Sequence, residues 1–179
     1  EIMLVAAMNP CPCGFATGRT RPCRCSPGAI ERYQRRLSGP LKDRFDLNVE
    51  VQAVPWAEVR GTLHAESTRD VRRRIVEARA RQIARQGRLN AYLEGRQVEG
   101  ICSPADKTSE ALLGRGVRRL GLSVRGVTRV LRIARTIADL GGHPVVEAPH
   151  LAEALAFRLP EPSEAGSNLH FETMPVEGT

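Results

Sequence analysis

Aromatic residues and long apolar runs are scarce in this sequence. Only 4 % of the 179 residues are aromatic, with one Trp, two Tyr and four Phe. Hydrophobic residues nevertheless make up 41 %, so a core has to be built mainly from Leu, Val, Ile and Ala. No stretch approaches the roughly 18 apolar residues that span a bilayer, which predicts a protein without membrane contact.

The usual secretion and disulfide signals are also missing. Residues 1–8 are apolar, but they are too short and lack the basic leader of a signal peptide. We therefore expect a cytoplasmic protein with reduced cysteines, in which clustered cysteines are more often metal ligands than disulfides. The four histidines show no ligand-like spacing and are interpreted as surface or packing residues: His64, His143, His150 and His170.

The motifs that hold ATP phosphates and magnesium are absent as well. A phosphate-binding loop (Walker A) needs GxxxxGK[ST] between a strand and a helix, and neither Lys42 nor Lys107 lies in that pattern. The acidic pair of a Walker B motif, which would hold magnesium, is not found either. We expect these 179 residues alone neither to bind ATP tightly nor to hydrolyse it.

What the sequence does contain is arginine. The net charge is +7, and only Lys42 and Lys107 are lysines among the 27 basic residues. Arginine suits phosphate, so the composition fits a nucleotide or nucleic-acid partner, or simply solvated helix faces. Eight arginines crowd into residues 69–88: Arg69, Arg72, Arg73, Arg74, Arg79, Arg81, Arg85 and Arg88. They predict a helix that contacts DNA phosphates, a neighbouring subunit or water.

The chain order predicts an α/β segment followed by an all-α bundle. Residues 2–7 form an apolar run typical of a buried strand, and apolar residues alternate over 47–51. Helices are predicted over 29–38, from Thr68 to Gly87, from Ser103-Pro104, from Ser123 to Leu140 and over 147–158. We expect four regions: the end of an α/β core over 1–55, with a cysteine-bearing insertion at 10–28; a linker over 56–66; a helical domain over 67–159; and a flexible tail over 160–179.

Four cysteines form a pair of C-x-C motifs nine residues apart: Cys11, Cys13, Cys23 and Cys25. Four thiolates so close in sequence can close a tetrahedral zinc site, which would give shape to a loop rich in Gly and Pro. An iron–sulfur cluster uses the same ligands, and four reduced thiols without metal are the third interpretation. Cys102 stands alone and is interpreted as a half-buried packing residue.

Three stretches carry a family resemblance: LVAAMNPCPCG, RYQRRLSGPLKDRFDL and LSVRGVTRVLRIARTIADL. In this order they are similar to the magnesium-chelatase-like AAA+ family, and in particular to its ComM-type branch. The similarity extends over residues 2–158. It implies the C-terminal half of an AAA+ nucleotide-binding domain followed by a helical lid.

The resemblance assigns roles to three residues. Asn9 is implied as sensor 1, a carboxamide that orients water toward a terminal phosphate; a turn residue before Pro10 is the alternative. Arg44 is implied as the arginine finger that reaches a neighbouring subunit. Arg36 is a second candidate, and an ion pair with Asp43 or Asp46 would be a purely structural role for Arg44.

Arg125, near the start of the helix predicted from Ser123, is implied as sensor 2. Arg129 and Arg132 follow near the same face, so the role could fall one turn later, and a solvated arginine face is the alternative.

The resemblance implies an ATPase that uses ATP and Mg²⁺, assembles into a homo-oligomer with a hexameric ring, and remodels DNA by branch migration. Two alternatives remain open: the ATPase subunit of a magnesium chelatase, and a non-catalytic zinc-binding interaction fragment. The first alternative would require a large porphyrin-binding partner.

Overall fold

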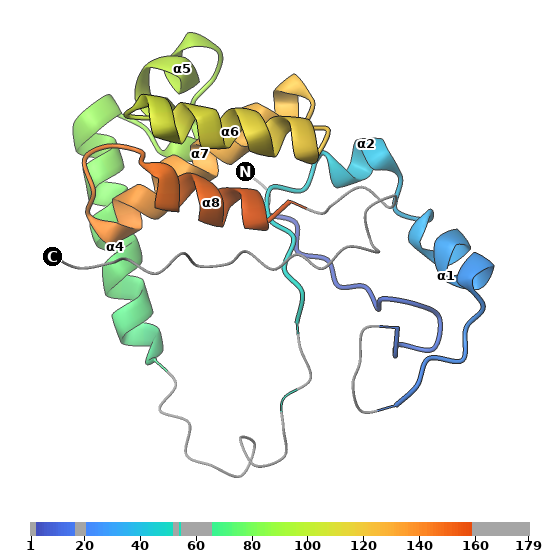
Figure 1. Ribbon diagram of the computed structural model, residues 1–179. Helices are drawn as coiled ribbons and strands as arrows, with labels where there is room; N and C mark the ends of the chain where they lie inside the picture. Colours follow the sequence, from blue (N-terminus) through green and yellow to red (C-terminus); the bar gives the residue numbers. More distant parts are fainter. Residues whose placement is uncertain (1–2, 17–20, 52–53, 55–65, 159–179) are drawn as a thin grey trace, which may run out of the picture. The chain divides into compact units, whose positions relative to one another are not determined.

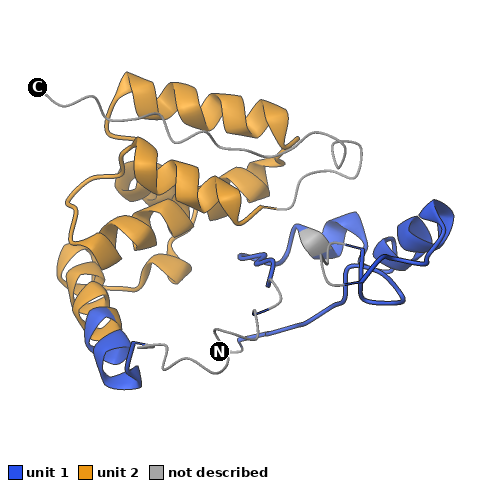
Figure 2. Ribbon diagram, turned by 60° about the horizontal axis from the view of Figure 1, so that its bottom comes forward, with its two compact units in different colours: residues 1–74 blue, residues 75–179 orange. Residues whose placement is uncertain are grey.

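The computed structural model describes residues 3–16, 21–51, 54 and 66–158. The chain divides into two compact units, Glu1–Arg74 and Ile75–Thr179 (Figure 2), and each is considered by itself. The predicted linker, apart from Glu66, and the predicted tail lie outside the described residues.

The first unit contains two short helices, α1 (Pro27–Gln34) and α2 (Gly39–Lys42). Helix α1 begins where Ser26 accepts a hydrogen bond from the Ala29 N–H at 3.3 Å, and Pro27 occupies the first turn, where its missing N–H costs nothing. Among the described residues of this unit only Cys11 is fully buried. The unit therefore has no apolar core of the usual kind in the part described.

The two strands expected over 2–7 and 47–51 are a wrong prediction for the described residues. Residues 3–7 and 47–51 form no strand, and Met3 and Val51 are each 87 % exposed. A strand needs a neighbour to take its backbone hydrogen bonds. The described residues offer only one isolated bridge, between Pro104 and Val146, which pairs neither segment. The α/β part of the expected fold is thus not formed here, whereas the helical part is.

The second unit is helical, and its boundary with the first falls inside α4. Its elements are α4 (Thr68–Gln86), the 3-10 helix η1 (Asn90–Tyr92), α5 (Arg96–Cys102), α6 (Lys107–Arg119), α7 (Val124–Gly141) and α8 (Ala148–Ala156). Figure 1 shows α8 beside α6 and α7, in agreement with the contacts of α7 with α8 and α5 and of α6 with α8.

Local chemistry sets the helix ends. Ser67 caps α4 through the Asp70 N–H, and Ser123 caps α7 through the Gly126 N–H at 3.1 Å. Gly142 ends α7 with φ at +75°, the left-handed conformation that favours glycine. The predicted helix start at Ser103-Pro104 is wrong: α6 begins after Asp106, which accepts a hydrogen bond from the Ser109 N–H.

The core of the second unit lies between α7, α8 and α6. Its fully buried members are Val130, Ala134, Val146, Leu151, Ala154 and Leu155. Helices α6 and α8 approach closely at Gly116, where an added Cβ would meet Leu155 Cδ1 at 2.6 Å. Cys102 is fully buried in a second cluster with Leu93 and Val98, deeper than expected. In the described part of the chain, every helix is too short or too polar to cross a bilayer.

Candidate functional site

The four cysteines of the first unit converge, as their spacing predicts. Gly14 makes the turn between them, with φ at +84° and its N–H donating to the Cys11 carbonyl. The Sγ atoms of Cys11 and Cys13 are 3.3 Å apart, and Cys23 Sγ lies 3.7 Å and 3.6 Å from them. Cys25 completes the group, whose four sulfur atoms all lie within 4.8 Å of one another. None of the four forms a disulfide.

Crowding strongly perturbs the titration of these thiols. Backbone N–H groups of Arg24 and Phe15 donate to Cys13 and lower its pKa to about 6. For Cys25, a backbone hydrogen bond at Cys13 lowers the pKa, but the Cys13 thiol, burial and the other two sulfur atoms outweigh it and raise the pKa to about 12. A thiolate at one cysteine thus makes ionisation of the next thiol unfavourable. A bound cation would offset this repulsion and allow all four thiols to ionise.

The sulfur geometry fits a tetrahedral metal. A Zn–S bond of about 2.3 Å implies sulfur–sulfur edges of about 3.8 Å, close to the distances found here. The N–H of Cys25 also points to Cys23 Sγ at 3.4 Å, the kind of outer hydrogen bond that orients a ligand. The donor set is therefore suitable for Zn²⁺.

Asn9 and Arg44 lie in the same unit as the cysteines and are both exposed. Asn9 directly precedes the cysteine loop, and its Cγ lies 4.0 Å from the position of a Cβ built on Gly14. Arg44 follows α2 and donates from Nη1 to the Pro40 carbonyl at 3.1 Å. This contact anchors one edge of the guanidinium at the surface.

The three sensor 2 candidates of α7 have different surroundings. Arg125 is exposed in the first turn of the helix. Arg132 is half-buried and donates to the Ala91 carbonyl at 3.0 Å, and Arg129 is half-buried as well. Of the three, Arg125 is the side chain with free access to solvent.

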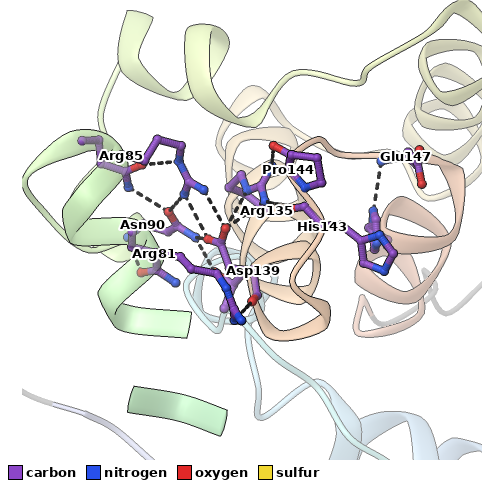
Figure 3. A network of polar contacts seen from close by, with 12 residues as sticks. Arg81, Arg85, Asn90, Arg135, Asp139, His143, Pro144 and Glu147 are labelled. Carbon is purple, nitrogen blue, oxygen red and sulfur yellow. Dashed lines mark hydrogen bonds and ion pairs between the residues drawn. The ribbon is translucent and has the colours of Figure 1, made fainter. Parts of the chain in front are cut away.

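A buried polar network, which no sequence pattern indicated, joins α4, η1 and α7 (Figure 3). Asp139, 1 % exposed, accepts hydrogen bonds from Arg85 at 2.6 and 3.0 Å, from Arg135 at 2.8 Å and from Asn90 at 2.8 Å. Burial alone would raise the pKa of Asp139, but these donors hold it below its usual value. Arg81 donates to the Asp139 carbonyl. Two of the eight arginines of residues 69–88, Arg81 and Arg85, therefore have a structural role.

Two of the histidines interpreted as surface or packing residues lie together in the structure, one exposed and one buried. His143 and His150 lie with ring centroids 4.9 Å apart, and with Glu147 they form a group whose ligand-type atoms are within 4.8 Å. His150 Nδ1, however, accepts the Glu147 N–H at 3.0 Å as part of the capping box of α8. If Nε2 of the neutral His150 ring bound a metal, Nδ1 would carry the proton. That proton would point at the Glu147 N–H, and Nδ1 could not accept its hydrogen bond. The group is a helix cap, and spacing alone gave no sign of it.

Two family models match the chain in consecutive order. "Magnesium chelatase, subunit ChlI" matches residues 1–59, and "Magnesium chelatase, subunit ChlI C-terminal" matches residues 65–158. The second model alone covers more than half of the chain.

Among curated proteins, the chain is 45 % identical over 159 residues to "Competence protein ComM" of Haemophilus influenzae. It is 40 % identical over 159 residues to "Uncharacterized protein YifB" of Escherichia coli. Each match covers 88 % of this chain and 31 % of the relative, so the chain spans about a third of the length of these relatives. With both family models matched in order, the chain belongs to the magnesium-chelatase-like family.

Proposed function

We propose that this chain is the C-terminal portion of an AAA+ ATPase of the magnesium-chelatase-like family that remodels DNA by branch migration. The observation that carries the proposal is the ordered match to both family models, together with 45 % identity to a competence protein over most of the chain. The working enzyme would bind ATP and Mg²⁺ and form a hexameric ring, with the second unit as its helical lid.

In this proposal three side chains complete a nucleotide site. Asn9 orients the water that attacks the terminal phosphate. Arg44 reaches the γ-phosphate held by a neighbouring subunit and stabilises charge in the transition state, an effect of about 10³–10⁵ in rate. Arg125 folds onto the β- and γ-phosphates. The exposure of all three residues supports these roles, because a side chain that is already buried could not reach a nucleotide.

We further propose that Cys11, Cys13, Cys23 and Cys25 hold a structural zinc ion. The support is the sulfur spacing and the lack of any other core around the loop in the described residues. The ion would fix the fold of the loop beside Asn9 and take no part in ATP chemistry.

The sharpest test is Arg44→Ala in the intact protein. We expect kcat for ATP hydrolysis to fall about 10³-fold while the affinity for ATP changes little, because a finger acts on the nucleotide of a neighbour. Arg35→Ala, which removes an exposed arginine paired with Glu31 at 2.6 Å, is the matched control and should keep full activity.

The outcomes of this test separate the candidates. A loss in Arg36→Ala with normal activity in Arg44→Ala would move the finger to Arg36. Normal kcat in both variants would contradict the proposed site. The rates at which the variants migrate a branched DNA junction should rank in the same order as their rates of ATP hydrolysis.

The alternative function is the ATPase subunit of a magnesium chelatase, favoured by the description of the matched family models. It predicts ATP-dependent magnesium insertion into a porphyrin when a large partner subunit is supplied. DNA junctions should then leave the ATPase rate unchanged, whereas the branch-migration proposal expects them to stimulate it.

A further inference from the structure

A hollow of about 460 Å³ opens beside the cysteine cluster, within the first unit. Its lining includes Cys13, Phe15, Arg21, Pro22 and Arg24. Arg21 and Arg24 are exposed, and Phe15 is half-buried. The hollow thus combines two exposed cations with one half-buried aromatic ring.

The chemistry of the lining suits a nucleotide unit better than a free anion. Arg21 already lies near the face of Phe15, with Cζ 5.9 Å from the ring centroid. An aromatic ring flanked by guanidinium groups offers stacking to a base and charge-assisted hydrogen bonds to its phosphate. A simple phosphate would use the arginines and leave the ring without a role.

The local charge also favours a polyanion. Residues 2–30 contain three arginines and no Asp, Glu or Lys. A zinc ion with four thiolates carries two negative charges, which the three arginines more than balance. No acidic side chain of this stretch would repel a nucleic-acid backbone.

We propose that this hollow binds single-stranded nucleic acid, with Phe15 as the stacking platform for a base and with Arg21 and Arg24 on the flanking phosphates. A base can reach the ring only when it is unpaired, since a duplex keeps its bases stacked on one another. The inference deepens the proposed DNA-remodelling function, on which it rests, by naming the strand form and the residues that bind it.

The test measures fluorescence anisotropy of a labelled oligo(dT) of about 20 nucleotides and of a duplex of equal length, with the intact zinc-loaded protein. Phe15→Leu is expected to weaken single-strand binding by about 10-fold, the effect of losing one stacked base, and to leave duplex binding unchanged. Arg21→Gln combined with Arg24→Gln is expected to weaken single-strand binding further. It should also reduce the salt slope by about 1.4, the contribution of two phosphates.

Arg32→Gln is the matched control, because it removes one exposed arginine of the same unit outside the hollow. Zinc content is measured in every variant, and Arg21→Lys with Arg24→Lys, which keeps both charges, should retain most of the binding. Equal losses for duplex and single strand, or equal losses in Arg32→Gln, would overturn the proposal. So would a Phe15→Leu variant with full zinc and unchanged single-strand affinity.

The same measurements distinguish this inference from the proposed function. A wild-type protein that hydrolyses ATP but does not bind oligo(dT) contradicts the single-strand site alone. A protein that binds oligo(dT) through Phe15 but never hydrolyses ATP contradicts the motor and leaves the site standing.

Discussion

The two units of this chain reach a defined shape by different physical means. In the described part of the first unit the only fully buried residue is a cysteine, and four sulfur atoms gather where a core would be. The second unit buries apolar side chains between α6, α7 and α8 and ties α4 to α7 through Asp139. The comparison teaches that a loop with little apolar surface depends on ligands, whereas a helical unit depends on packing.

The largest expected effect, unfolding of the cysteine loop on loss of zinc, is confined to the first unit. Cys13→Ser, or removal of metal by a chelator, should lower bound zinc from about one equivalent to near zero and unfold the cysteine loop. Structural zinc supplies about 10–16 kcal/mol to small domains, more than such a loop can replace. Metal analysis and hydrogen exchange across residues 10–34 provide the measurement. The unfolding midpoint of the second unit should not move. A wild-type protein that binds less than about 0.3 equivalents of zinc would contradict the comparison.

The second-largest expected effect is a loss of stability in the second unit alone. Asp139→Asn leaves Arg85 and Arg135 without their shared carboxylate and should lower the free energy of unfolding by about 3–5 kcal/mol. Urea unfolding, followed by the helical circular dichroism signal, measures this free energy. Asp70→Asn is the control, since the Asp70 carboxylate makes only exposed contacts, a hydrogen bond from the Ser67 hydroxyl at 2.6 Å and a pair with Arg73 at 3.4 Å. Its replacement should cost less than about 1 kcal/mol. A similar fall in the free energy of unfolding in both variants would show that the buried Asp139 network contributes no more than an exposed ion pair.

Packing at the α6–α8 crossing gives a moderate effect. Gly116→Ala places a methyl group within 2.6 Å of Leu155 Cδ1 and should cost about 1–3 kcal/mol. Gly100→Ala, in α5 with no atom near the added Cβ, should instead stabilise the unit by up to about 1 kcal/mol through helix propensity. Thermal unfolding of both variants checks the opposite signs. Zinc content should be normal in each.

The smallest effect is a pH dependence of the second unit. Burial, followed by the neighbouring His143, lowers the pKa of His150, whose Nδ1 accepts the Glu147 N–H. The folded state therefore prefers neutral His150. Stability is full above the ordinary pKa of 6.5 and falls as the pH drops below it toward the lowered value. Thermal midpoints between pH 7 and 5 measure the slope, and His150→Asn should flatten it. An unchanged slope in that variant would assign the dependence to another group.

Local sequence signals predicted the helices well and the longer-range features poorly. Ser67, Ser123 and Gly142 mark helix ends because caps are made by neighbours in sequence. The C-x-C spacing likewise predicted that four sulfur atoms would meet. The strands over 2–7 and 47–51 were wrong for the described residues, since neither an apolar run nor an alternating pattern says whether a partner strand is at hand.

The contribution of Asp139 could not be foreseen from its sequence neighbours. Arg85 and Asn90 lie 54 and 49 positions away in the chain and reach Asp139 only after α4 and α7 pack. In the sequence, Arg85 looks like any other arginine of a strongly basic helix. Only the fold distinguishes it from Arg73, which remains exposed.

Most of the helices, the cysteine cluster and the family could be read from the amino-acid sequence, because each depends on residues close together or on an ordered set of motifs; the start of α6 could not. Only the packed structure shows which arginines bind the buried Asp139 carboxylate, that His150 closes a helix cap, and that Phe15, Arg21 and Arg24 line one hollow. These features arise from distances between side chains, and packing sets those distances.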